Sequence, residues 1–327
     1  MSLMVDVQGL SLDAADRELL QHPEVSGFIL FGRNVESVEQ VAELVRQVRG
    51  VRPDVLIAID YEGGRVQRIR TGVTRIPPMQ LLGAQPEAEQ LAYDAGLVIG
   101  AELAALDIDV PFAPVVDLDY GCSSVIGDRA FATEPSRVVT LAQALIQGLD
   151  AAGLAATLKH FPGHGAVVPD SHLELPVDAR AAECIAERDL RPFAELIRQG
   201  VPSVMTAHVV YSTVDDRPAS FSPVWIGEWL RGRLGFSGCV ISDDLSMAGA
   251  AAVGSPSDRV RLATEAGCDL LPMCNSRANV EQALTAMPAA EPSGARQRVR
   301  ALRRRERVVA PEQLEAARRR LEAISWT

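Results

Sequence analysis

Lysine is almost absent from this chain. Its 327 residues include 32 basic side chains, and only Lys159 among them is a lysine. Lysine carries a compact ammonium on a flexible stem, whereas arginine presents a planar fork. A chain that otherwise uses arginine, but keeps one lysine beside His160 and close to His164, indicates a position that needs a point charge. We therefore expect chemistry on a polar small molecule at this position.

Cysteine pairs and long apolar runs are also missing. The five cysteines are scattered, odd in number and never spaced as Cys-x-x-Cys, which argues against a disulfide framework and favours a reducing compartment. No stretch approaches the roughly 18 apolar residues of a membrane span, and the first residues lack the pattern of a signal peptide. We expect a cytoplasmic protein that does not enter a membrane.

A basic surface is lacking too. The formal net charge is −11, which disfavours nucleic acid as a partner.

The sequence also disfavours a metal site. His160 and His164 stand four residues apart, but Pro162 and Gly163 between them disfavour the helix on which this spacing would bring both rings to one ion. We expect neither a metal nor another cofactor.

Short apolar runs alternate with longer stretches of helical spacing along most of the chain. Each run is about as long as a buried parallel strand and is bounded by glycine, proline or polar residues. The eight runs lie at 4–7, 28–31, 55–60, 108–116, 155–159, 204–207, 239–243 and 270–273. Strands that alternate with helices in this way predict an α/β fold, namely a (β/α)₈ barrel of the TIM type.

The C-terminal part differs in composition. Residues 285–296 are rich in alanine, proline, serine and glycine, which is typical of a linker. Arginine-rich stretches at 297–308 and 311–324 predict two terminal helices within 297–325. They are too short for a second domain, so we expect them to pack on the barrel and residues 1–327 to form a single catalytic domain.

Polar side chains stand at the C-terminal ends of several apolar runs. In a (β/α)₈ barrel all these ends lie on one face, where active sites are built. Taken alone, an acid at such an end could instead cap the next helix, and a histidine could be a buried core residue. The residues that we expect on this face are Asp60, Lys159, His160, His208, Asp243 and Asp244.

The run LRGRLGFSGCVISDDLS at 230–246 combines a glycine-rich turn, an aliphatic strand and two acids. It resembles the active-site signature of glycoside hydrolase family 3, in which a strand ends in Ser/Thr-Asp and that aspartate is the nucleophile. The resemblance implies that Asp243 is the nucleophile and Asp244 its neighbour. One departure is Arg233, which stands where the family usually has Glu, Gln or Lys.

Further segments resemble the bacterial β-N-acetylglucosaminidase branch of this family, in the same order along the chain. KHFPGHG at 159–165 is similar to the family's Lys-His pair, and DYEGGRVQR at 60–68 to a sugar-binding segment, with Tyr61 where glutamine is commoner. IGDRAF at 126–131 matches another segment. The substrate-binding residues that the resemblance implies are Asp60, Arg68, Arg129, Lys159 and His160.

The segment from Asp170 to His172 resembles the acid/base dyad of the same branch. The resemblance implies that His172 is the general acid/base and that Asp170 orients it. A retaining glycosidase needs a nucleophile on one face of the sugar and a proton donor on the other, and an imidazole with an ordinary pKa of about 6.5 suits the second task. Because glycine and proline punctuate this loop, we expect it to close over the substrate as a lid.

The resemblance implies an exo-acting, retaining β-N-acetylglucosaminidase. Its partner would be a small muropeptide or amino sugar, and the reaction would release terminal GlcNAc from GlcNAc-anhydroMurNAc peptides in peptidoglycan recycling. Three alternatives stay open: a phosphorylase on the same fold, a sugar-binding barrel without catalysis, and a metal-dependent hydrolase. The 2-acetamido group of the substrate could also assist the reaction. The motifs do not specify the oligomeric state.

Overall fold

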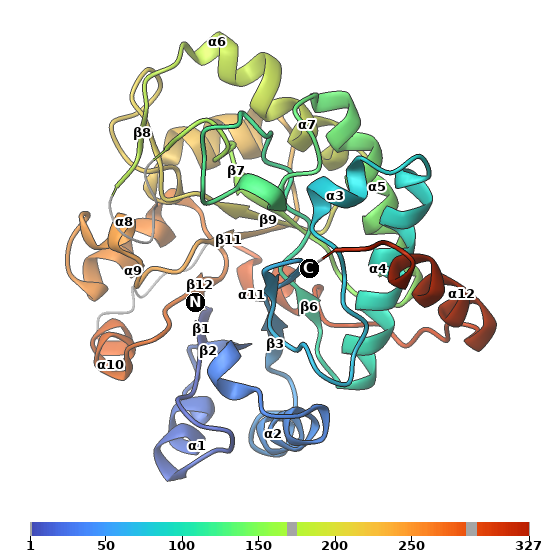
Figure 1. Ribbon diagram of the computed structural model, residues 1–327. Coiled ribbons are helices and arrows are strands. Elements are labelled where there is room, and N and C mark those ends of the chain that lie inside the picture. The colour runs from blue at the N-terminus through green and yellow to red at the C-terminus, as the bar shows by residue number, and fades with distance from the viewer. Residues whose placement is uncertain (1, 169–174, 286–292, 327) are drawn as a thin grey trace.

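The computed structural model describes residues 2–168, 175–285 and 293–326. Parallel strands lie at its centre and helices surround them (Figure 1). Five of these strands form one sheet in the order β12-β1-β2-β3-β6, and three form another in the order β11-β9-β7. Their bounds are β1 (Leu3–Val5), β2 (Val25–Leu30), β3 (Leu56–Ile59), β6 (Val110–Pro111), β7 (Thr157–Phe161), β9 (Ser203–Thr206), β11 (Cys239–Ser242) and β12 (Leu271–Pro272).

Two single bridges join the sheets into a ring. Val115, beyond β6, pairs in parallel with Lys159 of β7, and Ile241 of β11 pairs in parallel with Leu270, next to β12. The strand order therefore returns to its start, and the predicted (β/α)₈ barrel is confirmed. Each strand overlaps one of the eight apolar runs. Because the strands are parallel, their C-terminal ends meet at one face.

The barrel wall separates two apolar layers. Ile29, Met205 and Ile241 belong to one buried cluster, which fills the barrel. Their neighbours in sequence, such as Phe28 and Val240, belong to the cluster between the strands and the helices. Successive side chains of a strand point to opposite faces, so a run that is apolar at every position serves both layers.

The surrounding helices follow the spacing of apolar residues. In α2 (Val38–Val51) the buried residues include Val41, Leu44 and Val48, which share one face, and the Ser37 hydroxyl accepts from the Gln40 N–H at 3.1 Å to cap the helix. The other main helices of the described ranges are α1 (Ala14–Gln21), α3 (Met79–Gly83), α4 (Ala88–Ala105), α5 (Pro135–Ala151), α6 (Ala182–Cys184), α7 (Leu190–Arg198), α8 (Ala248–Ala251), α9 (Pro256–Ala266) and α10 (Arg277–Thr285).

Shorter elements decorate the barrel. Two antiparallel strands follow β3, and two parallel ones lie within the segments that follow β7 and β9. Their bounds are β4 (Tyr61–Gly63), β5 (Val66–Gln67), β8 (Val177–Asp178) and β10 (Val210–Tyr211). The π-helical turns are η3 (Ile185–Asp189) and η5 (Val224–Arg233), and the 3₁₀ turns are η1 (Gly32–Asn34), η2 (Gly127–Arg129) and η4 (Ala219–Phe221).

The predicted limits of the C-terminal segments were partly wrong. Instead of a helix at 297–308, the structure has α11 (Ala295–Arg300), which also shortens the predicted linker 285–296. The helix stops because the barrel engages the following backbone: Arg304 N–H donates to Asp109 at 3.1 Å, and Arg305 N–H to the Gly153 carbonyl at 2.8 Å. These two N–H groups are therefore not available for the hydrogen bonds of a continued helix.

The last helix, α12 (Pro311–Glu322), lies along α4 (Figure 1). Arg320 of α12 donates to both oxygens of the buried Asp94 on α4, at 2.6 and 2.9 Å.

That the whole chain forms one domain stays a prediction. No helix in the described ranges is both long and apolar enough to cross a membrane.

Helices α4 and α5 approach so closely that their glycines touch the opposite backbone. A Cβ atom on Gly96 would come within 2.0 Å of the Leu145 carbonyl oxygen, and one on Gly148 within 2.2 Å of the Tyr93 carbonyl oxygen. No side chain fits between these helices at either position.

Gly148→Ala should therefore lower the free energy of unfolding by about 1–3 kcal/mol, because the methyl group forces α4 and α5 apart. Urea unfolding measures the loss. Gly50→Ala is the matched control: Gly50 lies in α2 with open space around its Cβ position, and alanine should stabilise that helix by up to about 1 kcal/mol. Equal stability of Gly148→Ala and the wild type would contradict the close packing.

Candidate active site

A cavity of about 700 Å³ opens at the C-terminal ends of the barrel strands. This volume lies within the roughly 300–1,000 Å³ of small-molecule sites. Ile29, Phe112 and Met205 provide apolar parts of the wall. The structure also brings most of the predicted residues to this wall, namely Asp60, Arg68, Arg129, Lys159, His160, Asp243 and Asp244.

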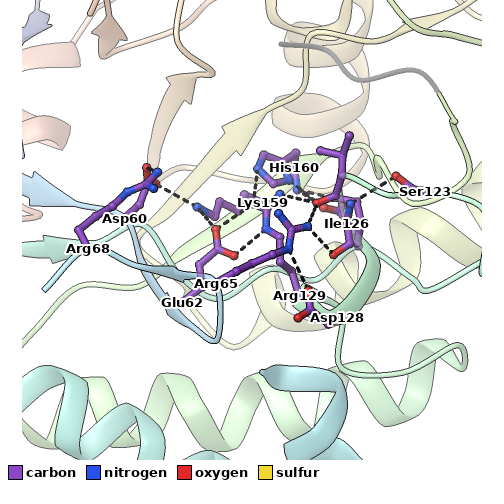
Figure 2. Close-up of polar contacts among 12 residues, drawn as sticks. Asp60, Glu62, Arg65, Arg68, Ser123, Ile126, Asp128, Arg129, Lys159 and His160 are labelled. Atoms are coloured by element: carbon purple, nitrogen blue, oxygen red, sulfur yellow. Dashed lines mark hydrogen bonds and ion pairs between the residues drawn. The ribbon is translucent and has the colours of Figure 1, made fainter. Parts of the chain in front are cut away.

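Asp60 follows β3 directly and lies between two cations. Lys159 Nζ is 3.3 Å from Asp60 Oδ1, and Arg68 donates to Oδ2 at 2.8 Å (Figure 2). Burial alone would raise the pKa of Asp60, but Lys159 and Arg68 outweigh burial and hold the pKa below its usual value. Asp60 is therefore an ionised acceptor at the cavity wall.

Glu62 is a site residue that the sequence reasoning missed. It lies in β4, is buried, and accepts from Arg129 through both oxygens, at 2.7 and 2.8 Å. Lys159 Nζ is 2.5 Å from Glu62 Oε1. Although burial opposes it, the charges of Arg129 and Lys159 depress the pKa of Glu62 far below the usual range. No apolar run ends at Glu62, so only its place inside the segment 60–68 pointed to it.

These ions form one connected group, in which Lys159 bridges the two carboxylates and an arginine binds the far side of each (Figure 2). A cis peptide bond joins Lys159 to His160, and both of these side chains line the cavity. We call the five ions the polar clamp: Asp60, Glu62, Arg68, Arg129 and Lys159.

Arg65 holds the loop that carries Arg129. Its Nε donates to Asp128 at 3.0 Å (Figure 2). Its Nη2 donates to the Val125 carbonyl at 2.5 Å. Arg129 itself ends η2 and donates to the same Val125 carbonyl at 3.1 Å. The segment 60–68 thus supplies both a partner for Arg129, through Glu62, and an anchor for its loop.

Asp117 is the second site residue that the sequence reasoning missed, although it follows the apolar run 108–116 directly. Its buried carboxylate lies 2.7 Å from His160 Nδ1 and accepts the His160 N–H at 3.1 Å and the His164 N–H at 2.7 Å. Burial lowers the pKa of His164, so that ring is neutral. Asp117 fixes both the His160 ring and the turn that follows it.

Asp243 and Asp244 have different surroundings. Asp243 N–H donates to the Thr206 carbonyl of β9 at 3.1 Å, and Asp243 lines the cavity. Asp244 Oδ1 accepts from Ser246 Oγ at 2.6 Å and from Cys274 N–H at 3.1 Å. Burial raises the pKa of Asp244. Asp244 therefore ties together the loops after β11 and β12, which leaves Asp243 as the candidate nucleophile.

Among the described residues, those that line the cavity do not include His208, which lies behind the cavity wall. It is buried, stacks on Phe221 with ring centroids 5.5 Å apart, and its Nε2 donates to the Asp244 carbonyl at 3.0 Å. Burial lowers its pKa and favours the neutral ring. Of the two predicted possibilities, the structure places His208 in the core.

The predicted dyad, Asp170 and His172, lies outside the described residues. Within 2–168, 175–285 and 293–326, no cluster of three or more histidine, cysteine or acidic residues has the arrangement of a metal site.

The sequence and the fold are similar to those of known proteins. Residues 3–308 match the family model of the glycosyl hydrolase family 3 N-terminal domain. A β-hexosaminidase of Pseudomonas aeruginosa is 51% identical over 286 residues, 88% of this chain and 86% of that protein. A β-hexosaminidase of Idiomarina loihiensis is 46% identical over 329 residues and 99% of both chains. The structure of NagZ from Neisseria gonorrhoeae in complex with N-trifluoroacetyl-D-glucosamine has a TM-score of 0.90 and 36% identity, over 98% of this chain and 97% of that one.

Glu62→Ala should lower the free energy of unfolding by about 3–5 kcal/mol, because Arg129 and Lys159 lose a shared partner while they stay buried. Urea unfolding at neutral pH measures this. Asp128→Ala is the matched control, since it removes the half-exposed partner of Arg65 and should cost less than about 1 kcal/mol. Similar losses in both variants would contradict a buried clamp.

The pH dependence of this stability has a definite sign. Because the pKa of Glu62 is depressed in the folded state, its contribution is complete above the ordinary carboxyl pKa of about 4.3 and is lost as the pH falls through the lower folded value. The difference in stability between the wild type and Glu62→Ala should therefore shrink in strong acid.

Proposed function

The chain belongs to glycoside hydrolase family 3, and we propose that it is an exo-acting, retaining β-N-acetylglucosaminidase. It is a glycoside hydrolase, related over most of its length to β-hexosaminidases. We propose as its substrates peptidoglycan fragments such as GlcNAc-anhydroMurNAc peptides, cleaved at terminal GlcNAc in the cytoplasm. In this proposal all 327 residues form one catalytic domain.

The observation that carries the proposal is the presence of Asp243 in one cavity with the polar clamp. Charged donors and acceptors form strong hydrogen bonds with hydroxyl and amide groups. The clamp has cations and carboxylates in near balance, which suits a neutral sugar better than an anion. A carboxylate that shares a cavity with such a clamp, at the end of a barrel strand, supports the proposal, because a retaining glycosidase needs a nucleophile at one face of the bound sugar.

In the proposed reaction Asp243 attacks the anomeric carbon and forms a glycosyl ester, while the bond to the leaving oxygen breaks. His172, as an imidazolium, gives its proton to that oxygen, and Asp170 orients the ring. The neutral His172 then takes a proton from water, which attacks the same carbon, and the ester bond to Asp243 breaks. Two inversions retain the configuration of the sugar.

The choice of an amino sugar draws on the relatives. Two of them are β-hexosaminidases, and the similar Neisseria gonorrhoeae NagZ structure contains N-trifluoroacetyl-D-glucosamine. That structure covers nearly the whole of this chain, so its ligand supports a GlcNAc-sized group as the natural occupant. The remaining volume of the cavity would serve the first part of the aglycone.

Asp243→Asn should lower kcat on an aryl N-acetyl-β-glucosaminide by about 10³- to 10⁵-fold, because no ester can form. Wild-type enzyme treated with a fluorinated GlcNAc inactivator should carry the label on Asp243, which peptide mapping detects. Asp244→Asn is the matched control: this variant should be less stable than the wild type, but the inactivator should still label it on Asp243. A label on Asp244 would overturn the assignment, and no label would indicate assistance by the 2-acetamido group.

The same assay tests the wider proposal with a GlcNAc-anhydroMurNAc peptide as substrate. GlcNAc should appear first as the β anomer in proton NMR spectra, at a rate that added phosphate does not change. The α anomer as first product would contradict retention. GlcNAc 1-phosphate would identify a phosphorylase, and no cleavage would refute the substrate.

His172→Ala should lower kcat by about 10²- to 10⁴-fold on substrates with poor leaving groups. The loss should be much smaller on a dinitrophenyl glycoside, whose leaving oxygen needs no proton. Steady-state rates on a series of aryl glycosides measure the difference. His22→Ala, which alters a histidine remote in sequence from every motif of the site, should behave as the wild type. An equal loss on all substrates would refute the acid role.

A further inference from the structure

We propose that Asp117 is a positioning residue that keeps the proton of His160 on Nδ1, so that Nε2 faces the cavity as a hydrogen-bond acceptor. The inference deepens the proposed function, because it concerns how His160 would bind a sugar hydroxyl.

The first argument comes from the side of the ring that faces the barrel wall. Burial alone would raise the pKa of Asp117, but contacts with His160 and His164 lower it, so the carboxylate is ionised. An ionised carboxylate only accepts hydrogen bonds. At 2.7 Å from Asp117 Oδ2, His160 Nδ1 must therefore be the donor. In a neutral imidazole the other nitrogen then has a lone pair.

The second argument is independent and comes from the cavity side. Arg129 Nη2 lies 3.5 Å from His160 Nε2 (Figure 2), and a guanidinium only donates. An N–H on Nε2 would point at this donor, whereas a lone pair can accept from it. An anion behind the ring and a cation in front of it thus favour the same tautomer. Both His160 and Arg129 line the cavity.

The consequence concerns the substrate. The contact between Arg129 Nη2 and His160 Nε2 is long, at 3.5 Å, so a sugar hydroxyl can replace Arg129 as the donor to Nε2. The same hydroxyl can accept from Lys159 or Arg129, because a hydroxyl has one hydrogen and two lone pairs. Glu62 is less available for this role, since its two oxygens already bind Arg129 twice and Lys159 once. Asp60 has one cation contact on each oxygen and can accept from a second hydroxyl. Asp117 would then select a hydroxyl at this position without touching the substrate.

Asp117→Asn separates this role from a merely structural one, because it keeps the shape of the side chain. The amide oxygen should stay where Oδ1 is, because Oδ1 accepts both the His160 N–H and the His164 N–H, at 3.1 and 2.7 Å. Of these two donors only the His160 N–H also reaches Oδ2, at 3.2 Å. The amide nitrogen then takes the place of Oδ2 and donates to His160 Nδ1. The proton moves to Nε2, which now opposes Arg129 and no longer accepts from a hydroxyl.

We expect Asp117→Asn to lower kcat/KM by about 10- to 100-fold, which corresponds to the loss of one hydrogen bond to a charged network, with most of the change in KM. Asp109→Asn is the matched control. Asp109 is as buried and lies directly before β6, near the opposite end of the apolar run 108–116, where it accepts from Ile57 N–H and Arg304 N–H. It should lose stability and keep both kinetic constants.

The decisive readout is the nitrogen NMR spectrum of protein labelled with ¹⁵N-histidine, in which His160→Gln identifies the signals. In the wild type His160 should carry its proton on Nδ1, and in Asp117→Asn on Nε2. A wild-type ring protonated on Nε2 overturns the proposal, even if Asp117→Asn fails to fold. So does a variant with unchanged kinetics.

A double-mutant cycle tests whether Asp117 acts through His160. In a His160→Ala background, Asp117→Asn should change kcat/KM by less than about threefold; additive losses would overturn the proposal. The outcomes also separate the two levels of inference. If the wild type cleaves no GlcNAc compound, the proposed function fails, while the NMR spectrum still reports whether Asp117 sets the tautomer.

Discussion

The site depends on the buried ammonium of Lys159. This ion joins β7 to the segment that follows β3, with Nζ 3.3 Å from Asp60 and 2.5 Å from Glu62. Buried charges are costly unless they are paired and hydrogen-bonded, so removing this ion would leave two carboxylates facing each other. A compact ammonium can approach both from one point, whereas a planar fork would favour parallel bonds to one of them. This requirement explains the one lysine of an arginine-rich chain.

The two ends of the barrel use similar ions for different purposes. At the N-terminal end the buried carboxylates already have partners within the protein. Asp109 binds Arg49 and the Arg304 N–H, and Asp269 binds Arg298. The C-terminal segment covers that end, and its charges contribute to the fold. At the opposite end the clamp and the His160 pair face a cavity of about 700 Å³. These charged groups pair with one another on one side and face the cavity on the other, so they can bind a ligand there.

The sequence predicted what depends on local pattern. The eight apolar runs located the strands, and the polar residues that end them located Asp60, Lys159 and Asp243, because parallel strands present their C-terminal ends on one face. Other features had a weaker signal. Glu62 ends no apolar run, and Asp117 stands among other aspartates after a long run. The helix predicted at 297–308 fails after Arg300, because distant barrel residues take its N–H groups.

What the sequence alone determined is therefore the barrel, the face that carries the site and the chemical types gathered there. The tertiary structure decided which charges pair: that Glu62 binds Arg129 across 67 positions, that Asp117 holds His160, and that Asp244 and His208 serve the framework beside Asp243. The reason is physical. Periodicity and strand ends are local properties, which a reader of the chain can count. Burial and pairing depend on distances between residues far apart in sequence, and these exist only once the barrel has closed.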